Sequence, residues 1–281
     1  MKPFASADAA RIAPKIAIDD LTLDYVNAES GERHRAVQGL DLDVRADEFL
    51  CVVGPSGCGK STLLAAIAGF LKPTAGTLTM DGRPIAGPGA DRGVVFQEYA
   101  LLPWMNVLDN AALGLKLRGV ARQERYAAAR RYLAIANLVG VEHKYPHELS
   151  GGMRQRVAVA RTLANSPEVM LMDEPFAAVD AQTRMVLQEE LVRISERSSL
   201  TVFFITHSVE EAIFLGDRVA VMSPGPGRVR HIVDVPFSRA ARTWKTLNAD
   251  PAFGALREEL LDLVRTPAAS AAAPAAQHAS A

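Results

Sequence analysis

Residues 54–62 read Gly-Pro-Ser-Gly-Cys-Gly-Lys-Ser-Thr and fit the pattern G-x-x-x-x-G-K-[ST]. Glycines let successive backbone N–H groups wrap around a phosphate chain without a clash from Cβ. The helix expected from Ser61 adds free N–H groups and the positive end of its dipole. Lys60 supplies a point charge to the outer phosphates, and the Ser61 hydroxyl can reach Mg²⁺. The spacing predicts a nucleotide site, with a ligand-free glycine-rich turn as the alternative. Its residues are Gly54, Pro55, Ser56, Gly57, Cys58, Gly59, Lys60, Ser61 and Thr62.

A second group of reactive side chains follows the apolar run 169–172, which ends in Asp173 and Glu174. A carboxylate at the tip of a strand beside a phosphate loop is suited to hold Mg²⁺, usually through water. We assign that role to Asp173. Glu174 is the next residue, so in a strand it points elsewhere, where it could polarise an attacking water as general base. A helix-capping loop would also explain an isolated acidic pair, but the phosphate loop favours catalysis.

The segment 149–156, Leu-Ser-Gly-Gly-Met-Arg-Gln-Arg, opens a predicted helix. Ser150 suits the N-cap, and Gly151 and Gly152 leave the first amides of the helix bare. Such an end can bind an anion, although a capped helix with a flexible start explains it equally well when it stands alone.

Alternating strands and helices must position these residues. Predicted strands lie at 21–25 and 40–44, around a polar loop at 27–35, and at the apolar runs 49–53, 169–172, 201–205 and 219–222. Helices are expected at 61–68 and 182–197 and over most of 100–165, and a turn at 223–227. This order indicates an α/β sheet protein with a helical insertion in its middle.

The composition excludes several classes of protein. The chain has 281 residues, 49% of them hydrophobic, and a net charge of −1. Near-neutral charge argues against nucleic acid as a main partner. Two cysteines make neither a disulfide framework nor a zinc site. No apolar run reaches the length of a membrane span, and the first residues do not form a signal peptide.

Together these motifs resemble those of ABC ATPases, in the same order, from about residue 16 to residue 262. The resemblance implies that Tyr25 stacks on adenine, that Gln97 senses Mg²⁺ and a transmembrane partner, that Asp180 belongs to the D-loop, and that His207 contacts the γ-phosphate. For single residues we keep plainer alternatives: a core or strand-edge tyrosine, a solvated glutamine and a capping histidine. The other five histidines show no shared pattern.

The resemblance also implies an architecture and an assembly. The fold is expected to be a P-loop NTPase (ABC ATPase) core with a β-subdomain and an inserted α-helical subdomain. An ATPase domain over 15–265, with its helical insertion at about 98–163, would follow a flexible leader (1–14) and precede a disordered tail (266–281). Two chains would stack head to tail around two ATP molecules. Ser150, Gly151 and Gly152 of one chain would then contact the phosphate held by Lys60 of the other.

The same resemblance assigns the chemistry. Catalytic roles are implied for Glu174, His207 and Gln97, and Mg²⁺ binding for Ser61, Gln97 and Asp173. The D-loop reads Ala177-Ala178-Val179-Asp180, and Ser208 stands where many relatives carry aspartate. Neither departure removes a catalytic residue.

Residues 87–97 and 101–107 are similar to the nitrate, sulfonate and taurine import subfamily, and most like taurine importers. This implies a transmembrane permease dimer, a periplasmic substrate-binding protein as an indirect partner, and a peripheral position on the cytoplasmic face of the inner membrane. Another sulfonate, nitrate or another small anion is the alternative cargo, and a soluble ABC ATPase the alternative function. Trp104 is either a core residue of the helical subdomain or part of the groove that receives a permease helix.

Overall fold

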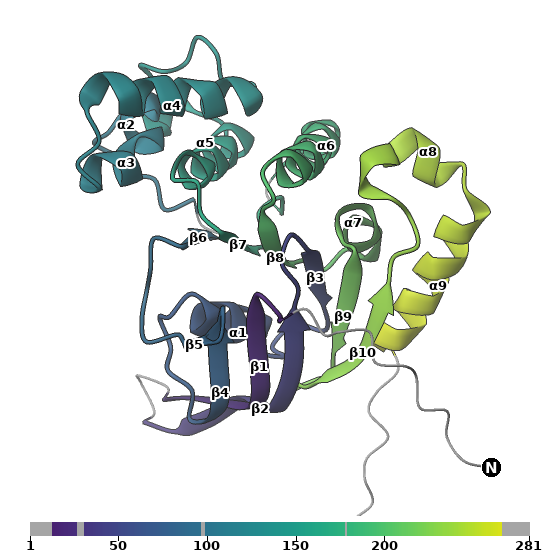
Figure 1. The fold of residues 1–281 in the computed structure, drawn as a ribbon. Coiled ribbons are helices and arrows are strands. Elements are labelled where there is room, and N and C mark those ends of the chain that lie inside the picture. Colours follow the sequence, from purple (N-terminus) through teal and green to yellow (C-terminus); the bar gives the residue numbers. More distant parts are fainter. Residues whose placement is uncertain (1–12, 27–30, 97–98, 178, 266–281) are drawn as a thin grey trace, which may run out of the picture.

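The computed structural model describes residues 13–26, 31–96, 99–177 and 179–265. Its centre is a six-stranded sheet in the order β10-β9-β3-β8-β7-β6 (Figure 1). All neighbouring strands in this sheet are parallel except β10, which pairs antiparallel with β9. The strands are β3 (Phe49–Val53), β6 (Arg92–Val95), β7 (Val169–Asp173), β8 (Thr201–Ile205), β9 (Arg218–Met222) and β10 (Val229–Asp234).

A smaller antiparallel sheet, in the order β2-β1-β4-β5, covers one side of the molecule. Its strands are β1 (Ile16–Val26), β2 (Arg33–Val44), β4 (Ala75–Met80) and β5 (Arg83–Pro84). The predicted pairing of the first two strands is confirmed. The loop between them is shorter than predicted, because β2 already begins at Arg33.

The central strands are apolar along their whole length because both of their faces are buried. In β3, Phe49, Cys51 and Val53 belong to one core, whereas Leu50 and Val52 belong to another. The first core also contains residues of the helices α5 (Gly151–Ala164), α6 (Ala181–Arg197), α7 (Val209–Leu215) and α9 (Pro251–Arg265). The second lies between the two sheets and includes α1 (Lys60–Ile67). Continuous apolar runs thus mark strands sandwiched between two layers.

A third core lies in a helical lobe, which is drawn in teal in Figure 1. The lobe contains α2 (Val107–Ala111), α3 (Leu113–Leu117), α4 (Arg122–Ile135), η1 (Pro146–Glu148) and the start of α5. Ala129 and Leu133 of α4 are four residues apart, on one face of the helix, and both are buried in this core.

The long helix that follows β7 is also confirmed, with its start at Ala181. Sequence analysis missed strands β4, β5, β6 and β10 and the helices α7 to α9, of which α8 spans Trp244–Asn248, as well as η2 (Arg239–Ala241). No helix in the described part of the chain is long and apolar enough to cross a membrane. The leader up to residue 12 and the tail from 266 lie outside the described residues.

Candidate active site

Three strands of the central sheet bring the predicted reactive residues together. In the sheet β8 lies between β3 and β7, and all three run parallel. Their carboxyl ends lead into the phosphate loop, the Asp173–Glu174 pair and the segment that carries His207. A cavity of about 280 Å³ opens there. It is lined by Tyr25, His34, Ala36, Ser56, Gly57, Gly59, Lys60, Ser61, Thr62, Glu174 and His207.

The phosphate loop depends on a glycine at the start of α1. Gly59 is the N-cap and has φ of 93°, in the left-handed region. A Cβ at this position would lie 2.6 Å from the carbonyl oxygen of Ala36 in β2. Glycine therefore allows both the turn into the helix and the close approach of the small sheet.

Backbone carbonyls of the phosphate loop hold the side chain of Lys60. Its side chain is buried, and its Nζ donates to the carbonyl oxygens of Gly54 (2.8 Å) and Pro55 (3.0 Å). These neutral acceptors leave the positive charge uncompensated, which suits an incoming phosphate. Cys58 is also buried, and burial raises the pKa of its thiol, so it is a packing residue rather than a nucleophile.

The donor set at the end of β7 fits a magnesium ion. Asp173 is hydrogen-bonded to the side chain of Ser61, and burial raises the pKa of its carboxyl. Its Oδ1 atom is buried without a hydrogen-bond partner among the described residues. A buried carboxylate oxygen in this state is costly, and a hard cation would satisfy it. Asp173 and Ser61 are therefore suited to hold Mg²⁺.

Glu174 and His207 form a pair at the edge of the cavity. Oε1 of Glu174 lies 2.6 Å from Nε2 of His207. β7 ends at Asp173, and Glu174 itself has φ of 47°. Its N–H donates to the carbonyl oxygen of Ile205 at the end of β8, at 3.1 Å. The direction of Glu174 is thus set by a left-handed turn and not, as we expected, by alternation along the strand.

His207 does not cap a helix. The N-cap of α7 is Ser208, whose Oγ accepts from the N–H of Glu211 at 3.1 Å. Serine therefore performs locally the capping that an aspartate would perform at this position. His207 is exposed and faces Glu174.

Tyr25 lies at the rim of the same cavity, next to a residue that sequence analysis missed. Tyr25 is 44% exposed, so it is not a core residue. Its ring centroid lies 5.1 Å from that of His34, its register partner across the β1–β2 pair. The hairpin register could have revealed His34, but the predicted loop at 27–35 placed it outside the strand.

The residues Ser150, Gly151 and Gly152 begin α5 as predicted. The Ser150 hydroxyl accepts from the N–H of Met153 at 3.3 Å. None of the three lines the cavity of its own chain. A Cβ on Gly152 would lie 3.7 Å from Val179, next to Asp180, which caps α6.

Two further predictions have different outcomes. Gln97 lies outside the described residues. Trp104 is 69% exposed, so its interpretation as a core residue of the helical lobe is wrong.

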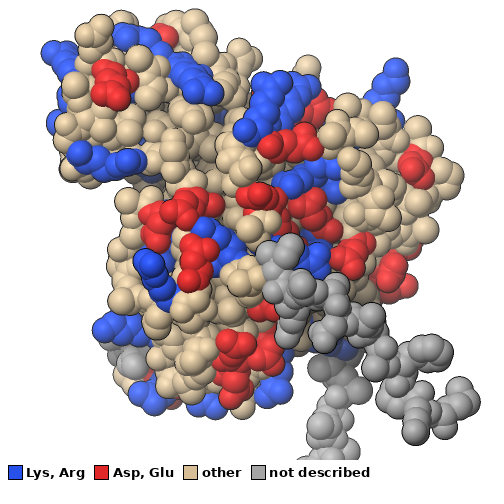
Figure 2. Space-filling view, viewed as in Figure 1, with Lys and Arg blue, Asp and Glu red and all other residues tan. Residues whose placement is uncertain are grey.

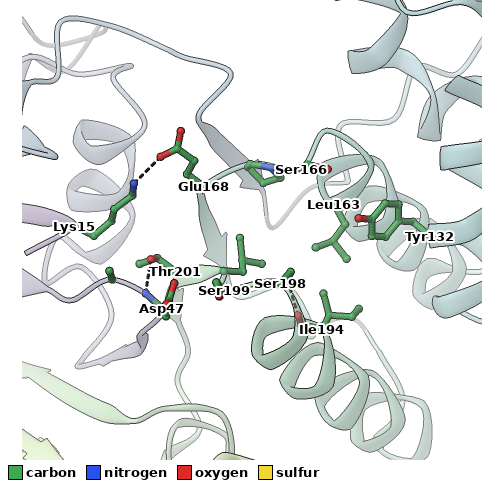
Figure 3. A pocket seen from close by; sticks show the side chains of 13 residues that line it. Lys15, Asp47, Tyr132, Leu163, Ser166, Glu168, Ile194, Ser198, Ser199 and Thr201 are labelled. Carbon is green, nitrogen blue, oxygen red and sulfur yellow. Dashed lines mark hydrogen bonds and ion pairs between the residues drawn. The ribbon is translucent and has the colours of Figure 1, made fainter. Parts of the chain in front are cut away.

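A larger cavity of about 360 Å³ lies at the opposite ends of β7 and β8 (Figure 3). Lys15, which lines this larger cavity, is paired with Glu168 (2.6 Å) and Asp81 (2.8 Å). The hydroxyl of Thr201, also in its lining, accepts from the backbone N–H of Asp47. These groups already satisfy one another, and none belongs to a predicted motif. Crevices at the carboxyl ends of parallel strands are the usual ligand sites, which favours the smaller cavity.

Comparisons with known proteins agree with the geometry. A family model described as "ABC transporter" matches residues 37–177. A taurine import ATP-binding protein of Rhizobium johnstonii is 52% identical over 239 residues, covering 84% of this chain and 91% of that protein. A nitrate import ATP-binding protein of a Synechocystis species is 46% identical over 235 residues, covering 82% and 88%.

Solved structures of a cassette from this family share the fold. The dimeric structure of a bacterial ABC transporter cassette superposes with a TM-score of 0.72 and 31% identity, covering 79% of this chain and 100% of that one. A post-hydrolysis state of the same cassette, bound to ADP and phosphate, gives a TM-score of 0.71 and 30% identity over the same shares. With its P-loop NTPase core, β-subdomain and inserted helices, this chain belongs to the ABC transporter family and is an ATPase of that family.

Proposed function

We propose that the chain hydrolyses ATP at the cavity between β3, β7 and β8, and that two chains share each ATP in a head-to-tail dimer. The observation that carries this proposal is the convergence of Lys60, Asp173 and the Glu174–His207 pair at adjacent strand ends. Phosphoryl transfer needs positioning and charge stabilisation more than covalent chemistry, and this site offers both.

Each residue has a distinct part in the proposed reaction. The N–H groups of the phosphate loop and the Lys60 ammonium bind the phosphates, and the exposed ring of Tyr25 stacks on adenine. Glu174 accepts a proton from the attacking water, whose oxygen forms a bond to the γ-phosphorus as the bond to the ADP oxygen breaks. His207 is hydrogen-bonded to Glu174 and faces the γ-phosphate. Bound Mg²⁺, held by Asp173 and Ser61 with Gln97, would neutralise phosphate charge.

The dimer supplies what one chain lacks. Ser150, Gly151 and Gly152 present a capped helix end with bare amides, yet they do not line the cavity of their own chain. In a head-to-tail pair they would contact the γ-phosphate held by the other chain. ATP would then bridge both faces, and hydrolysis would weaken the interface. A dimeric cassette among the structural relatives supports this assembly.

We further propose that this ATPase energises uptake of taurine or a related sulfonate, with nitrate or another small anion as the alternative. Identities of about half the aligned residues to taurine import proteins support the cargo class. The partners would be a permease dimer and, indirectly, a periplasmic binding protein, with the ATPase on the cytoplasmic face of the inner membrane. The domain limits given above, 15–265 with an insertion at 98–163, remain part of this proposal.

An exposed aromatic group supports a permease partner. Phe70 is 55% exposed, Phe96 40% and Trp104 69%, and the Phe70 and Phe96 rings stack at 6.0 Å. A contiguous exposed apolar patch, such as the stacked rings of Phe70 and Phe96, marks an interaction surface better than a single exposed side chain does. The alternative, a soluble ATPase that acts on nucleic acid, would need a broad basic face. Figure 2 instead shows acidic and basic side chains interleaved on the viewed side.

Two substitutions and one affinity purification test the proposal. Lys60→Ala is expected to abolish ATP turnover, and Glu174→Gln to trap an ATP-bound dimer detectable by size-exclusion chromatography. Normal turnover by Glu174→Gln would refute the general-base assignment. Purification of the tagged chain from its native membranes in mild detergent should recover a multi-span permease. Recovery of soluble or nucleic-acid partners alone would refute the transport role.

A further inference from the structure

Glu211 of α7 is a buried carboxylate that the proposed mechanism does not use. It is 8% exposed, and two buried polar side chains donate to it. The Thr206 hydroxyl donates to Oε2, and the amide Nε2 of Gln188 in α6 donates to Oε1 at 2.7 Å. A buried carboxylate is costly to keep unless it is hydrogen-bonded, so this arrangement is a specific one.

Two further hydrogen bonds fix the backbone on both sides of His207. Oγ1 of Thr206 accepts from the N–H of Ser208 at 3.0 Å. Oγ of Ser208 accepts in turn from the N–H of Glu211 at 3.1 Å. His207 lies between Thr206, which donates to the Glu211 carboxylate, and Ser208, which accepts from the backbone N–H of Glu211 and from whose N–H Thr206 accepts.

The network continues to the C-terminal part of the chain. Trp244 of α8 donates its indole N–H to Oε1 of Gln188 at 3.1 Å. This bond turns the Gln188 amide so that its NH₂ group must face Glu211. The Trp244 ring is fixed as well, because it stacks on Phe214 with 4.4 Å between centroids and 6° between planes.

We infer that Glu211 is a positioning residue, which holds the segment 206–208 in the place that directs His207 to Glu174. This inference rests on the proposed function, because it assumes that His207 takes part in hydrolysis. The side chain of His207 is 45% exposed, so packing around the ring alone does not fix it. Its place depends on the backbone that Thr206, Ser208 and Glu211 hold together.

Steady-state ATP hydrolysis by the full chain tests the inference through Glu211→Gln and Thr206→Val. In the first variant an NH₂ group replaces an acceptor oxygen, and in the second the hydroxyl disappears while the shape is kept. Each should lower kcat by about 10- to 100-fold, the cost of a small misplacement of a catalytic group. The KM for ATP should change by less than about threefold, because the phosphate loop is untouched.

Glu189→Gln on the outer side of α6 is the matched control. Within the described residues, the ion pair of Glu189 is a long contact with Arg193 (3.9 Å) at the surface, so kcat should not change. Urea unfolding of each variant at the assay temperature shows whether the fold is kept. If Glu211→Gln is too unstable to assay, Thr206→Val carries the test.

His207→Ala separates this inference from the proposed function. In that background Glu211→Gln should cause no further loss of kcat, because both changes act through one group. A further loss of kcat when Glu211→Gln is added to His207→Ala would overturn only the role of Glu211. So would normal kcat in Glu211→Gln when His207→Ala is inactive. Normal kcat in His207→Ala would instead overturn the proposed role of His207.

Discussion

At the scale of single residues, two glycines of the phosphate loop face different constraints. Gly57 and Gly59 both have positive φ, 77° and 93°. A Cβ on Gly57 would meet no atom of the described residues within 4 Å, whereas one on Gly59 would meet the Ala36 carbonyl oxygen at 2.6 Å. Gly57→Ala should therefore cost about 1–2 kcal/mol of stability, from backbone strain alone. Gly59→Ala should cost more and abolish ATP binding, because the loop must move away from β2.

Urea unfolding and equilibrium binding of a fluorescent ATP analogue would measure both effects. Gly57→Ala serves as the control for backbone strain, since it shares the left-handed conformation but lacks the close neighbour. Equal losses of ATP affinity in the two variants would contradict the steric argument.

A second residue-scale prediction concerns the pH dependence of stability. Burial raises the pKa of Glu211, although hydrogen bonds from Thr206 and Gln188 and the charge of Arg184 oppose the shift and Glu174 adds to it. The folded chain then binds the Glu211 proton more tightly than the unfolded chain does. The stabilisation that Glu211 contributes to the fold is complete at pH values below its pKa in the unfolded chain, near 4.5. It decreases as the pH rises through the raised pKa of the folded chain.

Glu211→Gln removes this titration. The free energy of unfolding of the wild type, relative to Glu211→Gln, should therefore fall as pH rises above about 4.5 toward neutrality. Urea titrations of both chains from pH 4.5 to pH 8 measure this difference. A relative stability of the wild type that rises with pH would show that the folded pKa is lowered instead.

At the scale of elements, Arg242 anchors the end of α7. Its side chain is buried, and Nη1 donates to the carbonyl oxygens of Phe214 (3.1 Å) and Gly216 (2.7 Å). Nε donates to the carbonyl oxygen of Phe237 at 3.1 Å, so one cation joins α7 to the C-terminal segment. Burial lowers the pKa of Arg242 to about 10, and the group remains charged at neutral pH.

Arg242→Met keeps the stem but leaves these carbonyls unpaired. We expect a loss of at least about 3 kcal/mol in the free energy of unfolding, because three carbonyls lose their donor at roughly 1–3 kcal/mol each. Arg193→Met on α6 is the control, because Arg193 is 55% exposed and a surface pair of this kind contributes under about 1 kcal/mol. Similar losses in the two variants, measured by urea unfolding, would contradict the anchoring role.

The elements also show which parts of the structure could be predicted. β3, β7 and β8 were predictable because each is apolar on both faces and leads into a segment that carries reactive residues. α7 was not, because it has seven residues and its buried Glu211 reads as a surface charge. β6 was not, because it has four residues and only Val95 is fully buried.

The site shows the same limit. The spacing of the sequence placed Lys60 and Asp173 after apolar strands, the family resemblance added His207, and the parallel sheet brings the three segments together. It could not place His34 beside Tyr25, because that contact depends on the register of a hairpin. It could not explain the direction of Glu174 either, which follows from a left-handed residue after the strand.

At the scale of the whole molecule, the proposed dimer makes a prediction that no single chain can satisfy. Each site would take Lys60 from one chain and the 150–152 helix end from the other. Gly151→Asp should disable that helix end without unfolding it, since an acidic residue in the first turn of a helix is stabilising. Its carboxylate would repel the γ-phosphate, so the variant should be inactive alone, as should Lys60→Ala.

Mixing the two inactive variants in equal amounts should restore ATP hydrolysis. Half of the dimers would then be mixed, and one of the two sites in each would be intact, so the rate should recover to roughly a quarter of the wild-type value. The control replaces the Gly151→Asp chain with the double variant Lys60→Ala/Gly151→Asp, which can form no intact site and should recover nothing. Recovery only in the first mixture places the two halves of each site on different chains, because no single chain in it carries both. An inactive first mixture, with dimers present by size-exclusion chromatography, would refute the shared site.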